Sequence, residues 1–214
     1  MTTTGQELTM DIDRLRVLRA LRLKGRVLAE DLPAATGVPA ARCAELTDQF
    51  IAAGHVEEAR GRLKLTVQGR DHLTGQLAAE RETLDGTRIK DLYDEFDEFN
   101  AELKSLMTRW QLKDPDTPND HTDPDYDQAV VDGLVDLDVR FQGLLAHMVD
   151  AAPRLAHYPA RFQHALNLVN TGDHSWFAKP LADSYHTVWF ELHEDLIGLA
   201  GLSRVEEAAA GRAE

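Results

Sequence analysis

Glycines divide the first part of the chain into short segments, and this division constrains the fold more than any other feature. Asp11 precedes apolar residues at helical spacing that stop at Gly25, which predicts an N-capped helix. Gly37 and Gly54 end two further predicted helices, the second of which has Pro39 in its first turn. The three predicted helices cover 12–24, 28–36 and 39–53.

Two runs typical of strands follow, over 55–60 and 62–66, with Gly61 at the turn between them. Thr66 is placed to cap the next helix, which we expect to begin near Val67. Helix, short helix, turn, helix and a two-stranded wing is the order of a winged helix-turn-helix.

The stretch AAGHVEEARGRLKLTVQGRDHL resembles the wing of MarR-like bacterial regulators. Those proteins read hydrophobic–LT–x–x–G–x–x–hydrophobic where this chain has Leu65, Thr66, Gly69, Arg70 and Leu73. The resemblance covers about 65 residues and implies a DNA-binding winged helix. Winged helices also dock proteins, so the fold alone does not establish DNA binding.

Beyond Leu73 the apolar pattern is helical throughout. Long helices are predicted over 88–111, 126–152, 160–170 and 184–199, with a Pro- and Asp-rich loop over 113–125. All three tryptophans and six of the seven phenylalanines lie beyond Arg70, which indicates a helical bundle with its own aromatic core. The predicted fold class is therefore mainly α, with an N-terminal winged helix followed by an all-α bundle. The predicted divisions are a winged helix over 1–75, a linker helix over 76–87, a bundle for dimerisation and effector binding over 88–205 and a flexible tail over 206–214.

The charge changes where the pattern changes. Residues 1–70 carry 11 Lys and Arg against 9 Asp and Glu, a net of +2, and residues 71–214 carry 12 against 28, a net of −16. The formal charge of −14 argues against general coating of nucleic acid, so DNA contact requires a local basic patch. No apolar run approaches the roughly 18 residues that span a bilayer. A lone cysteine, Cys43, and the lack of a secretory signal predict a cytoplasmic protein.

The predicted DNA-reading surface combines the third helix with the wing. Its residues are Arg42, Gln49, Arg60, Arg62, Lys64 and Arg70, whose donors suit bases or phosphates. Wing arginines that enter a minor groove are one expected mechanism. Glu45 and Asp48 on the same helix would repel phosphates if they faced them.

The segment DSYHTVWFELHEDL, with the preceding loop, is the candidate ligand pocket. Its candidate residues are His174, Trp176, Tyr185, His186, Trp189 and His193. Offsets of three, four and seven place the helical histidines on one face. Two interpretations stay open, a pocket for a metal or small anion and core histidines bonded to carboxylates. No HExxH or CxxC motif assigns a particular ion, so neither a metal nor another cofactor is specified.

The loop segment NDHTDPDYD also groups oxygen ligands that could hold a hard cation, but an Asx-turn loop that caps the helix at Tyr126 is favoured. The chain lacks a G-x-S-x-G elbow, a P-loop and a G-x-G-x-x-G after a strand, so an enzyme is not expected.

We therefore expect a transcriptional regulator that binds double-stranded operator DNA as a homodimer and responds to a small-molecule effector, without membrane attachment. The alternative is a protein-interaction or accessory module. NDHTDPDYD together with DSYHTVWFELHEDL resembles a helical segment associated with phosphoenolpyruvate-utilising, pyruvate phosphate dikinase-like proteins. That resemblance covers about 110 residues and implies a partner enzyme or a phosphorylated metabolite, but no catalytic residue.

Overall fold

The computed structural model describes residues 11–209. The chain divides into two compact units, Met1–Thr83 and Leu84–Glu214, which we call the winged unit and the helical unit. The boundary lies inside the segment 76–87 predicted as one linker helix. That prediction is wrong in detail, because the helix that starts at Val67 ends at Thr83 and the next begins at Gly86.

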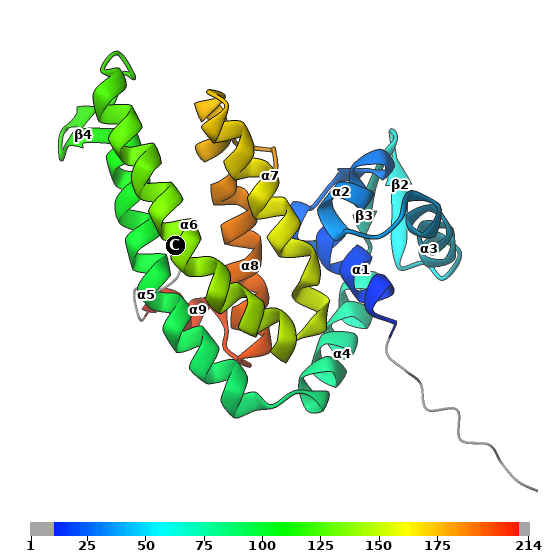
Figure 1. Cartoon of the computed structure of the whole chain (residues 1–214). Helices are drawn as coiled ribbons and strands as arrows, with labels where there is room; N and C mark the ends of the chain where they lie inside the picture. Colours follow the sequence, from blue (N-terminus) through cyan, green and yellow to red (C-terminus); the bar gives the residue numbers. More distant parts are fainter. Residues whose placement is uncertain (1–10, 210–214) are drawn as a thin grey trace, which may run out of the picture. The chain divides into compact units, whose positions relative to one another are not determined.

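The winged unit has the predicted order of helices and wing strands, with β1 and a 3-10 turn in addition (Figure 1). They are α1 (Ile12–Lys24), β1 (Val27–Leu28), η1 (Ala29–Asp31), α2 (Leu32–Thr36), α3 (Ala40–Ala52), β2 (Val56–Ala59), β3 (Arg62–Leu65) and α4 (Val67–Thr83). The helix predicted over 28–36 is shorter than expected, because Leu28 pairs with Arg62 and residues 29–31 form a 3-10 turn. The wing therefore joins a three-stranded antiparallel sheet with the order β1-β3-β2.

Local chemistry sets the ends of α1. The Asp11 carboxylate accepts hydrogen bonds from the backbone N–H groups of Asp13 and Arg14, at 3.1 and 3.3 Å, which confirms the predicted N-cap. Gly25 ends the helix at φ 74°, a conformation that other residues rarely adopt. Leu15, Leu18 and other apolar residues of α1 then pack with those of α2, α3 and the sheet into one core.

The helical unit contains four long helices and several short elements. They are α5 (Gly86–Gln111), β4 (Leu112–Asp114), β5 (Thr117–Pro118), α6 (Pro124–Ala151), η2 (Pro153–His157), α7 (Tyr158–Asn170), η3 (His174–Phe177), α8 (Tyr185–Leu199) and α9 (Arg204–Ala209). α5 and α6 run side by side, with the β4–β5 hairpin at one end of the pair (Figure 1). This hairpin lies where the sequence predicted only a loop.

The predicted flexible tail over 206–214 is wrong for its first residues, which belong to α9. Glu207 of this helix is buried and accepts a hydrogen bond of 2.5 Å from the Tyr93 hydroxyl. Residues 210–214 lie outside the described part of the chain.

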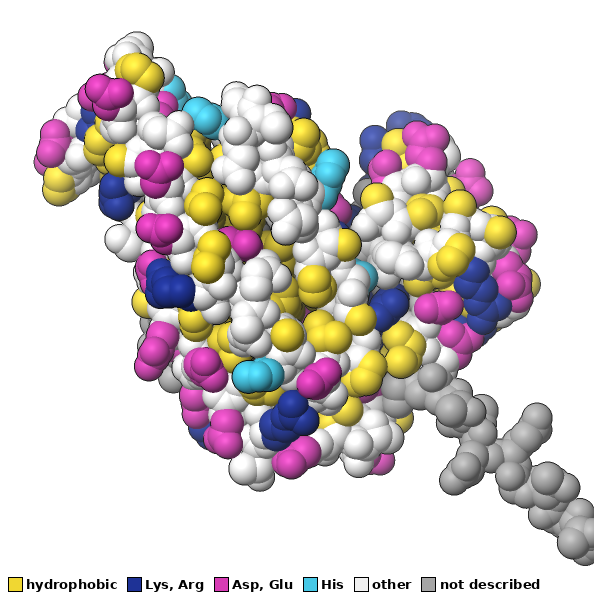
Figure 2. All heavy atoms as spheres, in the orientation of Figure 1, with side chains coloured by type: hydrophobic (Ala, Val, Ile, Leu, Met, Phe, Trp, Pro, Cys, Tyr) yellow, Lys and Arg dark blue, Asp and Glu magenta, His cyan; other side chains and the backbone are white. Residues whose placement is uncertain are grey.

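Aromatic rings fill the core of the helical unit, as the sequence predicted. The Trp189 ring lies 4.9 Å from Phe96 and 4.5 Å from Phe141, and Phe162 lies 5.0 Å from Tyr185. Acidic side chains are spread over the outer surface of α5 and α6 (Figure 2). Among the described helices, none combines the length and apolar character needed to cross a membrane.

Candidate functional site

The spacing of Thr66 and Gly69 has a structural explanation in the winged unit. The Thr66 hydroxyl donates to the carbonyl oxygen of Gly54 at 2.7 Å, and the Thr66 N–H donates to that of His55 at 3.0 Å. The Gly69 N–H in turn donates to the Thr66 hydroxyl at 3.0 Å. A Cβ at Gly69 would lie 1.9 Å from the His55 carbonyl oxygen. The motif therefore joins the turn after α3 to the start of α4.

Arg70, predicted to contact DNA, belongs to this junction. Its guanidinium donates to the carbonyl oxygen of Leu65 at 3.1 Å, and this bond ties α4 to the end of β3. The bond gives Arg70 a role in the fold, and no carboxylate of residues 11–209 pairs with it.

The polar residues of α3 are engaged with neighbours. Arg42 forms ion pairs with Asp11 at 2.6 Å and with Glu45 at 2.8 Å. The hydrogen bond to Glu45, followed by the charges of Glu45 and Asp11, raises the pKa of Arg42. Gln49 donates to Glu45 at 3.0 Å and accepts from Arg14 at 2.5 Å.

The remaining exposed surface of α3 is short or acidic. It consists of Ala40, Ala41, Ala44, Glu45 and Asp48, with Ile51 and Ala52 at the end of the helix. Alanine side chains have no hydrogen-bond donor for base edges, and the carboxylates of Glu45 and Asp48 repel phosphates. This helix therefore offers DNA few free donors.

The tip of the wing differs from α3. Arg60 and Gly61 form the two-residue turn between the paired residues Ala59 and Arg62. Their φ angles of 56° and 73° are the positive values that a type I′ hairpin turn requires. Arg60 and Arg62 are exposed, and neither has an ion pair or side-chain hydrogen bond with any other described residue.

Lys64 of β3 is half-buried and bound to Glu57 across the wing at 2.6 Å. This ion pair lowers the pKa of Glu57, and the charge of Arg26 lowers it further. Arg26 immediately precedes Val27, the partner of Leu63, so it extends the basic side of the sheet next to Lys64. The sequence prediction missed Arg26, because only the pairing of β1 with β3 brings it to the wing.

The six residues of the predicted ligand pocket do not form one site. Tyr185, Trp189 and His193 are buried in the core of the helical unit, whereas His186 is exposed in the first turn of α8. The Tyr185 hydroxyl donates to Asp138 at 2.9 Å, and the Trp189 indole N–H donates to Asn100 at 3.1 Å.

His193 follows the same pattern, since its Nε2 lies 3.2 Å from the Tyr93 hydroxyl. The contacts of these three buried side chains fit the interpretation of core residues with polar partners. They do not leave a set of free donors around a common space.

His174 and Trp176 lie on η3 and make separate aromatic contacts. The His174 ring is 6.1 Å from Trp110, edge to face, and Trp176 is 5.5 Å from His164. Lys179 lies over the Trp176 ring at 5.6 Å. Within the described residues, no group of three or more His, Cys, Asp or Glu side chains is arranged to hold a metal ion.

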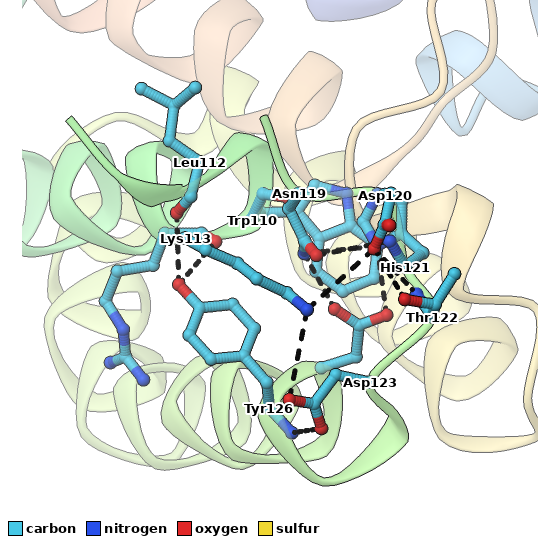
Figure 3. A network of polar contacts seen from close by, with 11 residues as sticks. Trp110, Leu112, Lys113, Asn119, Asp120, His121, Thr122, Asp123 and Tyr126 are labelled. Carbon is cyan, nitrogen blue, oxygen red and sulfur yellow. Dashed lines mark hydrogen bonds and ion pairs between the residues drawn. The ribbon is translucent and has the colours of Figure 1, made fainter. Parts of the chain in front are cut away.

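The NDHTDPDYD segment forms a hydrogen-bonded loop at the start of α6 (Figure 3). The Asp123 carboxylate accepts from the Tyr126 N–H at 3.1 Å, which confirms the predicted helix cap. Buried Asp127 accepts from Asn119 at 2.7 Å and lies 2.9 Å from Nδ1 of His121. The loop carboxylates are therefore used for capping and internal bonds.

A buried ion-pair network in the helical unit was not predicted from the sequence. Arg161 binds Glu191 at 2.6 Å and Asp183 at 3.0 Å, while Arg154 binds Asp195 at 2.9 Å. Each pair joins α8 or the loop before it to η2 or α7. The sequence alone does not show which charged residues pair, because each of them has many possible partners of opposite charge.

Comparison with family models, curated proteins and solved structures finds no match to this chain.

Proposed function

We propose that the protein is a winged-helix transcriptional regulator that binds double-stranded DNA through its winged unit. Support comes from the order of elements, from the β1-β3-β2 sheet and from the MarR-like Leu65–Thr66 motif that joins the wing to α4. In this proposal the acidic helical unit supplies a homodimer interface and an effector site, and the protein acts in the cytoplasm.

One observation carries the proposal. Arg60 and Arg62 project from the wing tip, exposed and without a carboxylate partner in the described chain. Two unpaired guanidinium groups on a narrow hairpin suit phosphates or a narrow minor groove, where negative potential is concentrated. Arg42 and Lys64 must instead exchange an existing carboxylate partner before they contact DNA.

The test measures binding of the full chain to genomic DNA fragments and to the inverted repeat that such fragments enrich. Arg60→Ala and Arg62→Ala should each weaken binding and reduce the dependence of log K on log salt by about one. Lys64→Ala should have a smaller effect, because Lys64 is already paired with Glu57 and has to leave it before it contacts a phosphate.

Arg88→Ala is the matched control, since Arg88 is an exposed arginine of the helical unit and its loss changes the net charge equally. Binding that is unchanged by the wing variants, or weakened as much by Arg88→Ala, would contradict the proposal.

A second candidate is a protein-interaction module that partners a phosphoenolpyruvate-utilising enzyme. The acidic exposed surface of α3, with Glu45 and Asp48, favours it. Failure of the purified chain to enrich any DNA site, together with co-purification of one such enzyme, would favour this candidate over DNA binding.

A further inference from the structure

Two histidines stack where α3, the wing and α4 meet. The rings of His55, in the turn between α3 and β2, and His72, in α4, have centroids 4.2 Å apart and planes inclined by 15°. Nδ1 of His55 is buried and has no hydrogen-bond partner among the described residues. A protonated His55 would place a charged N–H at this position without an acceptor.

A cation, Arg14, lies near the pair. From α1, the Arg14 guanidinium lies 4.6 Å from the centre of the Phe50 ring, and from α3 that ring lies 6.5 Å from His55. Burial lowers the pKa of His72, and the charges of His55 and Arg14 lower it further. No carboxylate of the described chain forms an ion pair with either imidazole. Protonation thus brings positive charge to a place without a counter-ion.

The pair is linked to the base of the wing, where β2 starts and β3 ends, which we call the wing root. The carbonyl oxygen of His55 accepts from the backbone N–H and the hydroxyl of Thr66, at 3.0 and 3.3 Å. These bonds hold the start of β2 against the residue that follows β3. Separation of the two rings would pull on the same turn.

We propose that the His55–His72 stack is an acid-sensitive catch, which holds the wing root against α4 while both rings are neutral and releases it when the pair takes up a proton. The loosening of the wing root is independent of DNA. Its consequence for DNA affinity rests on the proposed function.

The direction of the pH effect follows from the lowered pKa of His72. The unfolded chain, with a histidine pKa near 6.5, binds protons at a higher pH than the folded winged unit does. The contribution to stability is therefore complete above about pH 6.5 and is lost as the pH falls through the folded value.

Hydrogen exchange of the full chain tests the catch, with rates corrected for the intrinsic effect of pH. When the pH is lowered from about 7.5 to about 5.5, the protection factors of peptides that cover 50–66 should fall. This fall should be roughly tenfold larger than any fall in peptides of α6. His55→Phe and His72→Phe each keep a flat ring for stacking but remove one imidazole that can be protonated, so each should reduce this local loss. His147→Gln, which removes an exposed histidine of α6, should behave as wild type.

A wild-type chain without the local loss would overturn the proposal, and so would an equal loss in the two Phe variants. A Phe variant that does not fold is replaced by the other, since either alone removes one of the two charges.

DNA binding is measured separately. Acidification makes the protein less negative and should strengthen DNA binding in the Phe variants, whereas wild type should gain less or lose affinity. Absence of DNA binding in all chains would contradict the proposed function and leave the exchange result as the test of the catch.

Discussion

Replacement of Gly69 by alanine probes the junction between the wing and α4. The new Cβ would lie 1.9 Å from the carbonyl oxygen of His55 and 2.8 Å from its carbonyl carbon, far inside van der Waals contact. The neighbouring atoms are backbone, so the turn itself has to move by more than about 1 Å. The same carbonyl accepts both hydrogen bonds from Thr66, which the movement would break.

These effects give the expected magnitude. Overpacking costs about 1–3 kcal/mol and two lost hydrogen bonds cost about 1 kcal/mol each, while the helix propensity of alanine returns about 1 kcal/mol. The free energy of unfolding of the winged unit should therefore fall by about 2–4 kcal/mol. Gly75→Ala in the same helix is the matched control, because a Cβ there meets nothing within 4 Å. It should stabilise the unit by about 0.4–1 kcal/mol.

Urea unfolding followed by two probes locates the loss. Far-UV circular dichroism reports both units, whereas tryptophan fluorescence reports the helical unit, since Trp110, Trp176 and Trp189 all lie there. The Gly69→Ala loss should appear in the dichroism transition of the winged unit. The reasoning is refuted if Gly69→Ala stays within about 0.5 kcal/mol of wild type, or if Gly75→Ala is equally damaging.

Substitutions at two further residues test polar contacts. Burial raises the pKa of Asp138, so its ionised form opposes folding from about pH 3.8 upward, and stability is lost as the pH rises through the folded value. Asp138→Asn keeps the oxygen that accepts from Tyr185 and Gln142 and should be more stable than wild type at neutral pH in thermal unfolding. Asp138→Ala should lose about 1–2 kcal/mol, and a neutral alanine variant would contradict this account. Glu45→Gln should remove one of the two ion pairs of Arg42, leave the one with Asp11, and tighten DNA binding measured by fluorescence anisotropy; unchanged affinity would argue against α3 as a DNA-facing helix.

The sequence predicted the elements whose ends depend on local chemistry. The Asp11 cap, the Gly25 stop and the turn at Gly61 each involve residues a few positions apart, and the predicted mainly helical fold is confirmed. β1 was missed because its two residues are a strand only through pairing with Leu63 and Arg62, more than thirty positions away.

The candidate sites illustrate the same limit for side chains. Helical spacing placed Arg42 on the outer side of α3, but it cannot reveal Asp11 as its partner. Spacing also grouped His186 with His193, whereas His186 is exposed and His193 is buried. Long-range contacts therefore decide which of the predicted donors are free.

The pairing of cations also bears on how the proposed regulator would distinguish DNA sequences. Residues 1–83 carry 12 Lys and Arg and 12 Asp and Glu, so the winged unit has no net charge to attract DNA as a whole. Contacts by Arg60 and Arg62 to phosphates position a protein but carry no sequence information directly. Base readout by Arg42 requires it to leave Glu45 and Asp11, and a good bidentate contact with guanine returns about 1–3 kcal/mol. Only a site that supplies this contact offsets the broken ion pairs, so the carboxylates around Arg42 would suppress binding to other sequences.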